Sequence, residues 1–80
     1  MPRLDPDQQA VKDLGERLFG AEFHGKLARI SLVSRSYISQ IVRGDRPVTP
    51  AVENAITAGI RREIKRLRDA LKTYEKREDK

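Results

Sequence analysis

The sequence predicts an all-α fold, a compact bundle of about four helices with a long C-terminal helix. Apolar residues recur at spacings of three and four along most of the 80-residue chain, as expected of amphipathic helices. No long stretch alternates apolar and polar side chains as a half-buried strand would. Apart from Pro2, the prolines stand where a helix is expected to begin or in one connecting loop.

The first helix is expected to begin at Pro6 and to end at Gly20. Asp5 has the side chain of an N-cap residue, proline suits the first helical position, and Gln8 is placed to close a capping box. Glycine is the usual residue just past a helix end. The apolar side of this helix is expected to contain Ala10, Val11, Leu14, Leu18 and Phe19.

Two short helices are expected next. The segment "EFHGKLARI" favours a helix of about ten residues, because its apolar residues fall mostly along one face. Ser34 can cap a third helix that ends near Gly44. The expected buried faces are Phe23, Leu27, Ala28 and Ile30 on the second helix, and Ile38, Ile41, Val42 and part of Tyr37 on the third.

The segment "GDRPVTP" predicts a loop, because two of its seven residues are proline. Thr49 is expected to cap the last helix, with Pro50 at the first helical position and Glu53 reaching back to complete the cap. No further proline follows, so the helix can run from residue 50 to about residue 77. Residues 1–58 are then expected to form the main domain and residues 59–80 a helical extension.

Composition excludes several classes of site. The chain has no cysteine and one histidine, so disulfides, thiolate zinc sites and ordinary metal clusters are not expected, and neither is any cofactor. No apolar run is long enough to cross a bilayer, and the first residues lack the pattern of a secretion signal, so we expect a cytoplasmic protein. A core of this size is marginal, and burial against a second subunit would help to hold the fold.

Charge is unevenly distributed along the chain. Residues 1–23 carry three bases and five acids, whereas residues 24–46 carry five bases and Asp45 as the one acid. The chain as a whole has a formal charge of +5. A basic central third is typical of a surface that meets phosphate, although a lopsided stretch can also arise by chance in so charged a chain.

The segment "KLARISLVSRSYISQIVRGDRPVTP" resembles the helix-turn-helix of the phage repressor and Cro-like transcription regulators. Its preceding "LFGAEF" resembles the lead-in of some short phage and mobile-element members. The resemblance covers roughly residues 14–55. It implies a helix-turn-helix DNA-binding domain in residues 1–58, whose recognition helix, residues 34–43, enters the DNA major groove. The matching positions are Leu27, Ala28, Val33, Ile38, Ile41 and the loop "RGDRPVTP".

One position departs from the family. Where the family's turn usually carries glycine, this chain has Leu32, and leucine is strained at positive φ. Either the turn is built differently or local packing holds the strain.

The resemblance assigns two sets of DNA contacts. Arginine pairs with guanine and glutamine with adenine through two hydrogen bonds each, and serine is a small adaptable contact. The residues implied as base contacts are Arg35, Ser36, Ser39 and Gln40. The residues expected at phosphates are His24, Lys26, Ser34, Tyr37, Arg43 and Arg46. The plain alternative is that Arg35 and Gln40 belong to a solvated helix face and that His24 is partly buried or solvent-facing.

Five apolar residues of the last helix are spaced 4, 3, 4 and 3, which is the seam spacing of a coiled coil: Ile60, Ile64, Leu67, Leu71 and Tyr74. The same stripe could instead finish the domain core, as Val52, Ala55 and Ile56 are expected to do. Beyond Leu67 the three short helices cannot cover it, so we expect a homodimer in which residues 59–80 supply the interface. In a parallel pair, Glu63 would face the partner's Arg68.

The sequence therefore predicts a homodimeric regulator that binds double-stranded DNA at a palindromic operator, as a repressor by default. No membrane, small-molecule ligand or enzymatic activity is expected, because the serines have cap and groove roles and the acids of the first helix lie on an exposed face. A protein-interaction module, such as an antitoxin or accessory subunit, is the first alternative. Non-specific nucleoid or plasmid DNA binding is the second.

Overall fold

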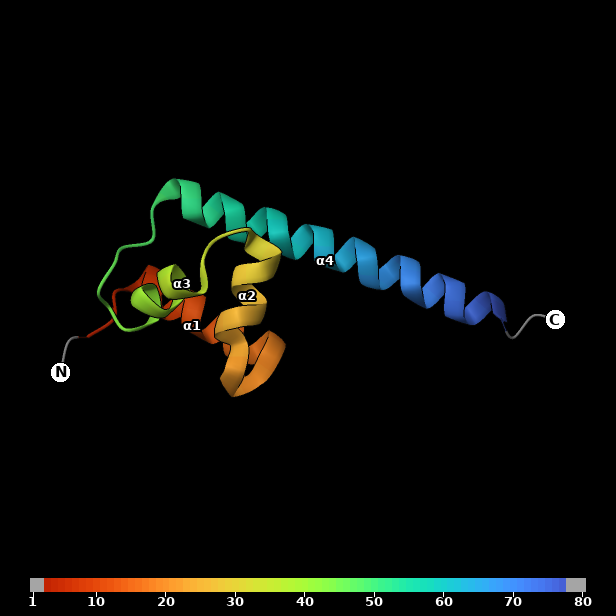
Figure 1. Cartoon of the computed structure of the whole chain (residues 1–80), viewed down its shortest axis with the longest axis horizontal. Helices are drawn as coiled ribbons and strands as arrows, with labels where there is room; N and C mark the ends of the chain where they lie inside the picture. The colour runs from red at the N-terminus through yellow and green to blue at the C-terminus, as the bar shows by residue number, and fades with distance from the viewer. Residues whose placement is uncertain (1–2, 78–80) are drawn as a thin grey trace.

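A computed structural model describes residues 3–77 of the chain. These residues form helices joined by short turns and contain no strand, which confirms the predicted all-α class. Helices α1, α2 and α3 cluster under the N-terminal half of α4, whose C-terminal half extends alone from the bundle (Figure 1). In chain order the elements are α1 (Pro6–Phe19), the 3-10 turn η1 (Gly20–Glu22), α2 (Phe23–Ser31), α3 (Arg35–Val42) and α4 (Pro50–Lys76). Within residues 3–77, none of these helices combines the length and apolar character needed to span a bilayer.

The helix starts form at the predicted caps. The carboxylate of Asp5 accepts from the Gln8 backbone N–H at 2.7 Å, and the Gln8 side chain accepts from the Asp5 N–H at 2.9 Å. Thr49 Oγ1 accepts from the Val52 N–H at 3.2 Å. The expected contribution of Glu53 to this cap is wrong, because Val52 occupies the third helical position, from which a side chain could reach back.

The core lies where α2 and α3 meet α1 and the N-terminal half of α4. Leu27 of α2 and Ile38 and Ile41 of α3 have no exposed surface. These three side chains occupy the inward positions that helical spacing predicts. The other buried hydrophobic residues are Val11, Phe23, Ala28, Val52 and Ile56.

Helix α1 is rotated relative to the prediction, although three of its five predicted core residues, Val11, Leu14 and Phe19, do lie in the core or against it. Ala10 and Leu18 are exposed, whereas Gly15 is buried. The reason is the ring of Phe23, which packs so closely on α1 that a Cβ at Gly15 would lie 2.2 Å from Phe23 Cδ1. The missing side chain at Gly15 makes room for this ring and turns Leu18 outward.

Helix α4 approaches α2 closely at Gly59. A Cβ at this position would lie 2.2 Å from the carbonyl oxygen of Ile30, near the end of α2. One turn further along α4, Arg62 Nη2 donates to the same Ile30 carbonyl at 2.8 Å. This pair of contacts fixes α4 on the end of α2, and Arg62 supplies a structural hydrogen bond there.

The turn between α2 and α3 has the backbone that a glycine would adopt. Leu32 lies in the left-handed region at φ 59° and ψ 35°. The Val33 N–H donates to the Ala28 carbonyl at 3.1 Å, which is the wider bond of a Schellman motif. The Leu32 side chain is 81% exposed, so its own packing does not offset the backbone strain. The turn therefore has the usual backbone of a Schellman motif, and the strain of a left-handed leucine remains in it.

Candidate nucleic-acid interface

Helix α3 has one buried side and one outward side, and most of the predicted contact residues lie on the outward side. Ile38 and Ile41 point into the core, whereas Arg35 and Ser36 are exposed. Ser34 caps the helix through a 3.0 Å bond from the Tyr37 N–H to its hydroxyl oxygen. We call Arg35, Ser36, Ser39 and Gln40 the α3 face.

Gln40 is held in place by its neighbours. Its amide nitrogen donates to Ser36 Oγ at 3.2 Å, and its amide oxygen accepts from Arg46 Nε at 2.8 Å. The Arg46 guanidinium also lies over the Tyr37 ring, 4.7 Å from the ring centre. Because both polar ends of the amide are engaged, Gln40 has a fixed orientation, and any new partner must replace or share these bonds.

Ser39 and His24 contact each other. His24 Nδ1 lies 2.9 Å from Ser39 Oγ, and both residues are half-buried. The His24 ring also meets the edge of the Phe23 ring at a centroid distance of 4.5 Å. This pair ties α2 to α3 beside the α3 face. The sequence suggested separate DNA contacts for the two residues, and no local spacing could reveal a pairing across fifteen positions.

Three exposed cations border the α3 face, and we call Lys26, Arg43 and Arg46 the basic rim. Arg43 Nε lies 3.4 Å from Asp45 Oδ2, with both side chains well exposed, so this pair is screened and weak. The backbone at Arg46 is anchored by Gln8 of α1, whose amide nitrogen donates to the Arg46 carbonyl at 2.9 Å. Gln8 is buried, so the loop that carries Arg46 is fixed to the bundle at this point.

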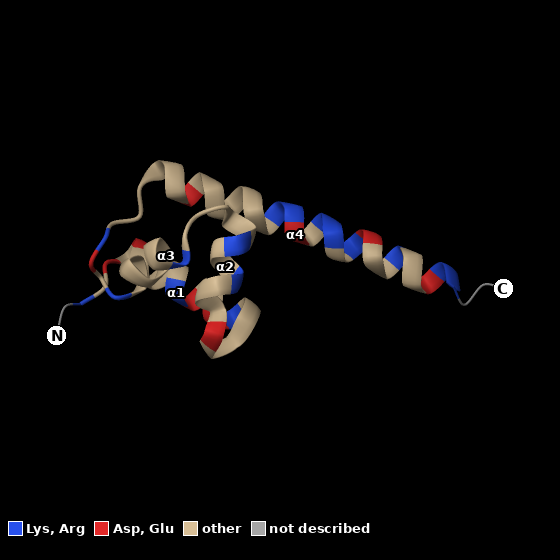
Figure 2. Cartoon of the chain, in the orientation of Figure 1, with Lys and Arg blue, Asp and Glu red and all other residues tan. Residues whose placement is uncertain are grey.

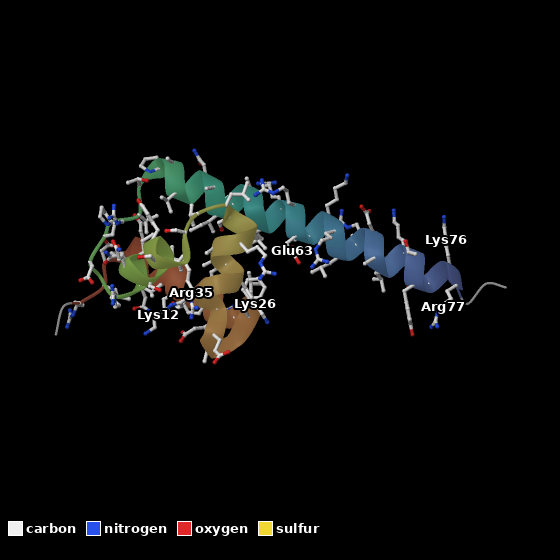
Figure 3. The ribbon with its side chains drawn as sticks, viewed as in Figure 1. Lys12, Lys26, Arg35, Glu63, Lys76 and Arg77 are labelled. Carbon is white, nitrogen blue, oxygen red and sulfur yellow. The ribbon has the colours of Figure 1, made fainter. Side chains whose placement is uncertain are left out.

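Arg35 projects next to α2. Figure 3 labels Arg35 and Lys26 on the bundle below α4, and Lys26 also lines a hollow with Glu63 and Arg66 of α4. Arg35 and Lys26 together help to line an open hollow with His24, Arg29, Gly25, Ala21 and Glu22. Arg29 is exposed and forms no salt bridge with the acids of α1 among the described residues.

This surface can donate hydrogen bonds to anions and to groups rich in hydrogen-bond acceptors. The α3 face carries one guanidinium, one amide and two hydroxyls, and the only acids beside it in the described chain are Glu22 in the hollow and Asp45 in the loop. Figure 2 shows further basic residues on α2 and on the C-terminal half of α4. Across residues 3–77, no cluster of three or more histidines and acids could hold a metal ion.

The apolar stripe of α4 divides into a covered end and an open end. Ile60 is half-buried against the core, whereas Ile64, Leu67, Leu71 and Tyr74 are 48% to 56% exposed. A shallow apolar groove between α1 and α4, lined in part by Leu14, Ile60 and Ile64, leads onto the open end. Residues 58 and 59, where the predicted extension begins, lie inside the continuous helix α4, and residues 78–80 of the extension fall outside the described chain.

Glu63 and Arg66 form an ion pair one turn apart on α4, and Arg66 Nε lies 3.2 Å from Glu63 Oε2. The hydrogen bond from Arg66 lowers the pKa of Glu63, and the same bond raises the pKa of Arg66. The Glu63 carboxylate that was expected to face a partner's Arg68 therefore already has a partner in its own helix.

Comparison with known proteins finds no match to this chain among family models, curated proteins or solved structures.

Proposed function

We propose that this chain is a sequence-specific, double-stranded DNA-binding transcription regulator. In this proposal it forms a helix-turn-helix bundle of about four helices, acts as a homodimer in the cytoplasm, and binds a palindromic operator through α3. Repression by blocking polymerase access is the simplest action, because neither a ligand-binding nor an activation segment is evident in the described chain.

One observation carries the proposal. The outward side of α3 exposes Arg35 and Ser36 and carries the half-buried Gln40, while Ile38 and Ile41 on the opposite side of the helix are completely buried. A helix seated on a core in this way, following a tight turn after a second helix, has the arrangement of a recognition helix in the major groove. The conformation of Leu32 supports this reading, since the turn takes the backbone that glycine gives the family.

The contacts separate into two classes by chemistry. Arg35 and Gln40 are proposed as the principal base readers, each worth about 1–3 kcal/mol of discrimination against a wrong base. Ser36 and Ser39 add short hydroxyl contacts at the same surface. The phosphate contacts are proposed to come from the basic rim with His24, Ser34 and Tyr37, which would fix the register of the protein on the duplex.

The bonds to Gln40 give Arg46 a second role. Arg46 holds the amide of Gln40 and also stacks on Tyr37, so its removal would disturb a base reader as well as a phosphate contact. Lys26 has no such bond and lies on α2. Lys26 is therefore the better position for testing phosphate binding alone.

The test is selection of bound duplexes from a random pool, followed by affinity measurements over a range of salt concentrations. Arg35→Ala is expected to reduce affinity for the selected site while leaving random duplex almost unaffected. Lys26→Ala is expected to weaken binding to both duplexes alike and to reduce the slope of log affinity against log salt concentration by about one. Lys76→Ala is the matched control, because Lys76 projects from α4 on the side opposite Arg35 (Figure 3).

Three outcomes would contradict the proposal. Equal losses on selected and random duplex for Arg35→Ala would remove Arg35 as a base reader. Failure of any preferred site to emerge would favour non-specific DNA binding. Absence of salt-dependent DNA binding, combined with a stable complex with another protein, would favour the protein-interaction alternative.

A further inference from the structure

We infer that His24 sets the direction of the hydrogen bond that Ser39 offers to DNA, and that the base preferred beside Ser39 therefore changes with pH. The inference rests on the proposed function and deepens it, because it makes His24 a positioning residue for one base contact of the α3 face. A neutral His24 leaves Ser39 with lone pairs alone to offer. A protonated His24 leaves Ser39 with a proton to donate.

The contact between His24 and Ser39 is set by the packing of two helices. His24 Nδ1 lies 2.9 Å from Ser39 Oγ. Phe23, which precedes His24 on α2, is 2% exposed, and Ile38, which precedes Ser39 on α3, has no exposed surface. The His24 and Phe23 rings meet edge to face, at an interplanar angle of 63°. Because the residues beside both partners are anchored in the core, the imidazole is held against the hydroxyl.

The charge on His24 decides what the Ser39 hydroxyl has left to offer. A serine hydroxyl has one proton and two lone pairs. If Nδ1 of a neutral imidazole accepts the proton, Ser39 has only lone pairs for a further partner. In a protonated histidine both ring nitrogens are donors. Nδ1 then donates to Oγ, and the Ser39 proton is free for another acceptor.

The proposed phosphate contact of His24 selects the neutral tautomer. Nδ1 is engaged by Ser39, so Nε2 is the ring nitrogen left for a phosphate oxygen, which accepts hydrogen bonds. A neutral imidazole that donates from Nε2 has no proton on Nδ1, so Nδ1 accepts from Ser39. A protonated imidazole donates to both partners at once. His24 therefore keeps its phosphate contact in both states, and Ser39 alone changes its role.

The two states of Ser39 suit different bases. In the major groove, adenine and cytosine present an amino donor, whereas guanine and thymine present a keto acceptor. As an acceptor only, Ser39 pairs with the amino group of adenine or cytosine. With a free proton, it also pairs with the keto oxygen of guanine or thymine. We therefore expect amino bases beside Ser39 at high pH and a rising share of keto bases at low pH.

The hollow that His24 helps to line brings charged groups of three elements near its ring. These groups are Glu22 of η1, Lys26 and Arg29 of α2, and Arg35 of α3, while α1 and α4 contribute no residue to this hollow. Histidine is the side chain whose charge ordinarily changes between about pH 5 and 8. The chain has one histidine, so a base preference that changes within this range points to His24.

Ser36 provides a comparison on the same α3 face. Its Oγ accepts from the Gln40 amide nitrogen at 3.2 Å. An amide does not titrate, so Ser36 keeps a free proton at either pH and is expected to remain a donor. Arg35 is constant as well, because a guanidinium stays charged. The base preference is therefore expected to change at the position that Ser39 reads and to stay fixed at the positions that Ser36 and Arg35 read.

The test is selection of bound duplexes from a random pool at about pH 5.5 and about pH 8, which bracket the usual range of histidine. The position that Ser39 reads is the one whose preference Ser39→Ala removes. There, affinity for keto bases relative to amino bases is expected to rise about five-fold at the lower pH, the size of one hydrogen bond. In His24→Asn, an amide replaces the titrating ring, and the selected bases should be the same at both pH values.

Several results would contradict the inference. One is the same set of bases at both pH values for the unmodified protein. Uniformly tighter binding at low pH with unchanged bases is another, because a phosphate contact alone gives that result. A change of bases that persists in His24→Asn would also overturn it. If no preferred duplex emerges at either pH, the proposed regulator is refuted, whereas a preferred duplex without the pH effect refutes only the role of His24.

A measurement without DNA checks the contact itself. The nitrogen NMR shifts of the His24 ring report which ring nitrogen carries a proton and whether Nδ1 is hydrogen-bonded. Ser39→Ala removes the partner of Nδ1, so it is expected to change these shifts. Ser36→Ala is the matched control, because the Ser36 hydroxyl bonds to Gln40. Ring shifts that are the same in both variants would show that Ser39 does not orient with His24.

Discussion

Substitution of Gly59 by alanine tests the close crossing of α4 and α2. In an isolated helix the change stabilises by about 1 kcal/mol, because alanine is the better helix former. In this protein the new Cβ would lie 2.2 Å from the Ile30 carbonyl oxygen and 3.0 Å from Ser31 Cα. Both neighbours belong to backbone, so the strain cannot be relieved by rotating a side chain, and α4 must withdraw from α2.

The magnitude follows from three contributions. Overpacking of this kind costs about 1–3 kcal/mol. Withdrawal of α4 also stretches the hydrogen bond from Arg62 to Ile30, whose loss costs about 1 kcal/mol. The gain in helix propensity offsets about 1 kcal/mol of this sum, so the expected net loss is about 1–3 kcal/mol. For a domain of this size, a loss of about 2 kcal/mol lowers Tm by roughly 10 °C.

The assay is urea and thermal unfolding followed by circular dichroism, with all variants at one protein concentration because the proposed dimer would make stability concentration-dependent. Gly25→Ala is the matched control. Gly25 lies inside α2, and its added Cβ would meet only Arg35 Cδ at 3.9 Å, an ordinary contact. We expect Gly25→Ala to stabilise by up to about 1 kcal/mol. A Gly59→Ala variant as stable as Gly25→Ala would refute the close crossing.

Three further predictions concern stability. Leu32→Gly is expected to stabilise by up to about 1 kcal/mol, because relief of about 1–2 kcal/mol of left-handed strain exceeds the entropic cost of glycine; a lower urea midpoint would contradict it. Ser31→Ala is expected to raise the midpoint by up to about 1 kcal/mol, since the Ser31 hydroxyl is buried without a hydrogen-bond partner among the described residues; a clear loss of stability would indicate a partner for this hydroxyl. The lowered pKa of Glu63 makes its pair with Arg66 stabilising above the ordinary pKa range of glutamate, and this contribution is lost as pH falls through the lowered pKa. Glu63→Gln should therefore make stability slightly less sensitive to acid, measured as the change in urea midpoint between neutral and acidic pH, and an unchanged acid dependence would argue against the pair.

The sequence alone determined the helical class and the helix starts. The caps at Asp5, Ser34 and Thr49 depend on bonds across three residues, and such local rules can be read without knowing the fold. The inward positions of α3 followed from spacing in the same way. The exposed end of the α4 stripe was also predicted, because its apolar spacing continues beyond the reach of the short helices.

Other features depended on contacts between distant parts of the chain. The rotation of α1 follows from the Phe23 ring, which packs on Gly15. The contact between His24 and Ser39 joins α2 to α3. Neither contact leaves a periodic signal in the sequence, because each depends on how two helices happen to cross. The sequence left the backbone conformation of Leu32 undecided for the same reason. Its strain is tolerated only because the packed helices on either side fix the turn.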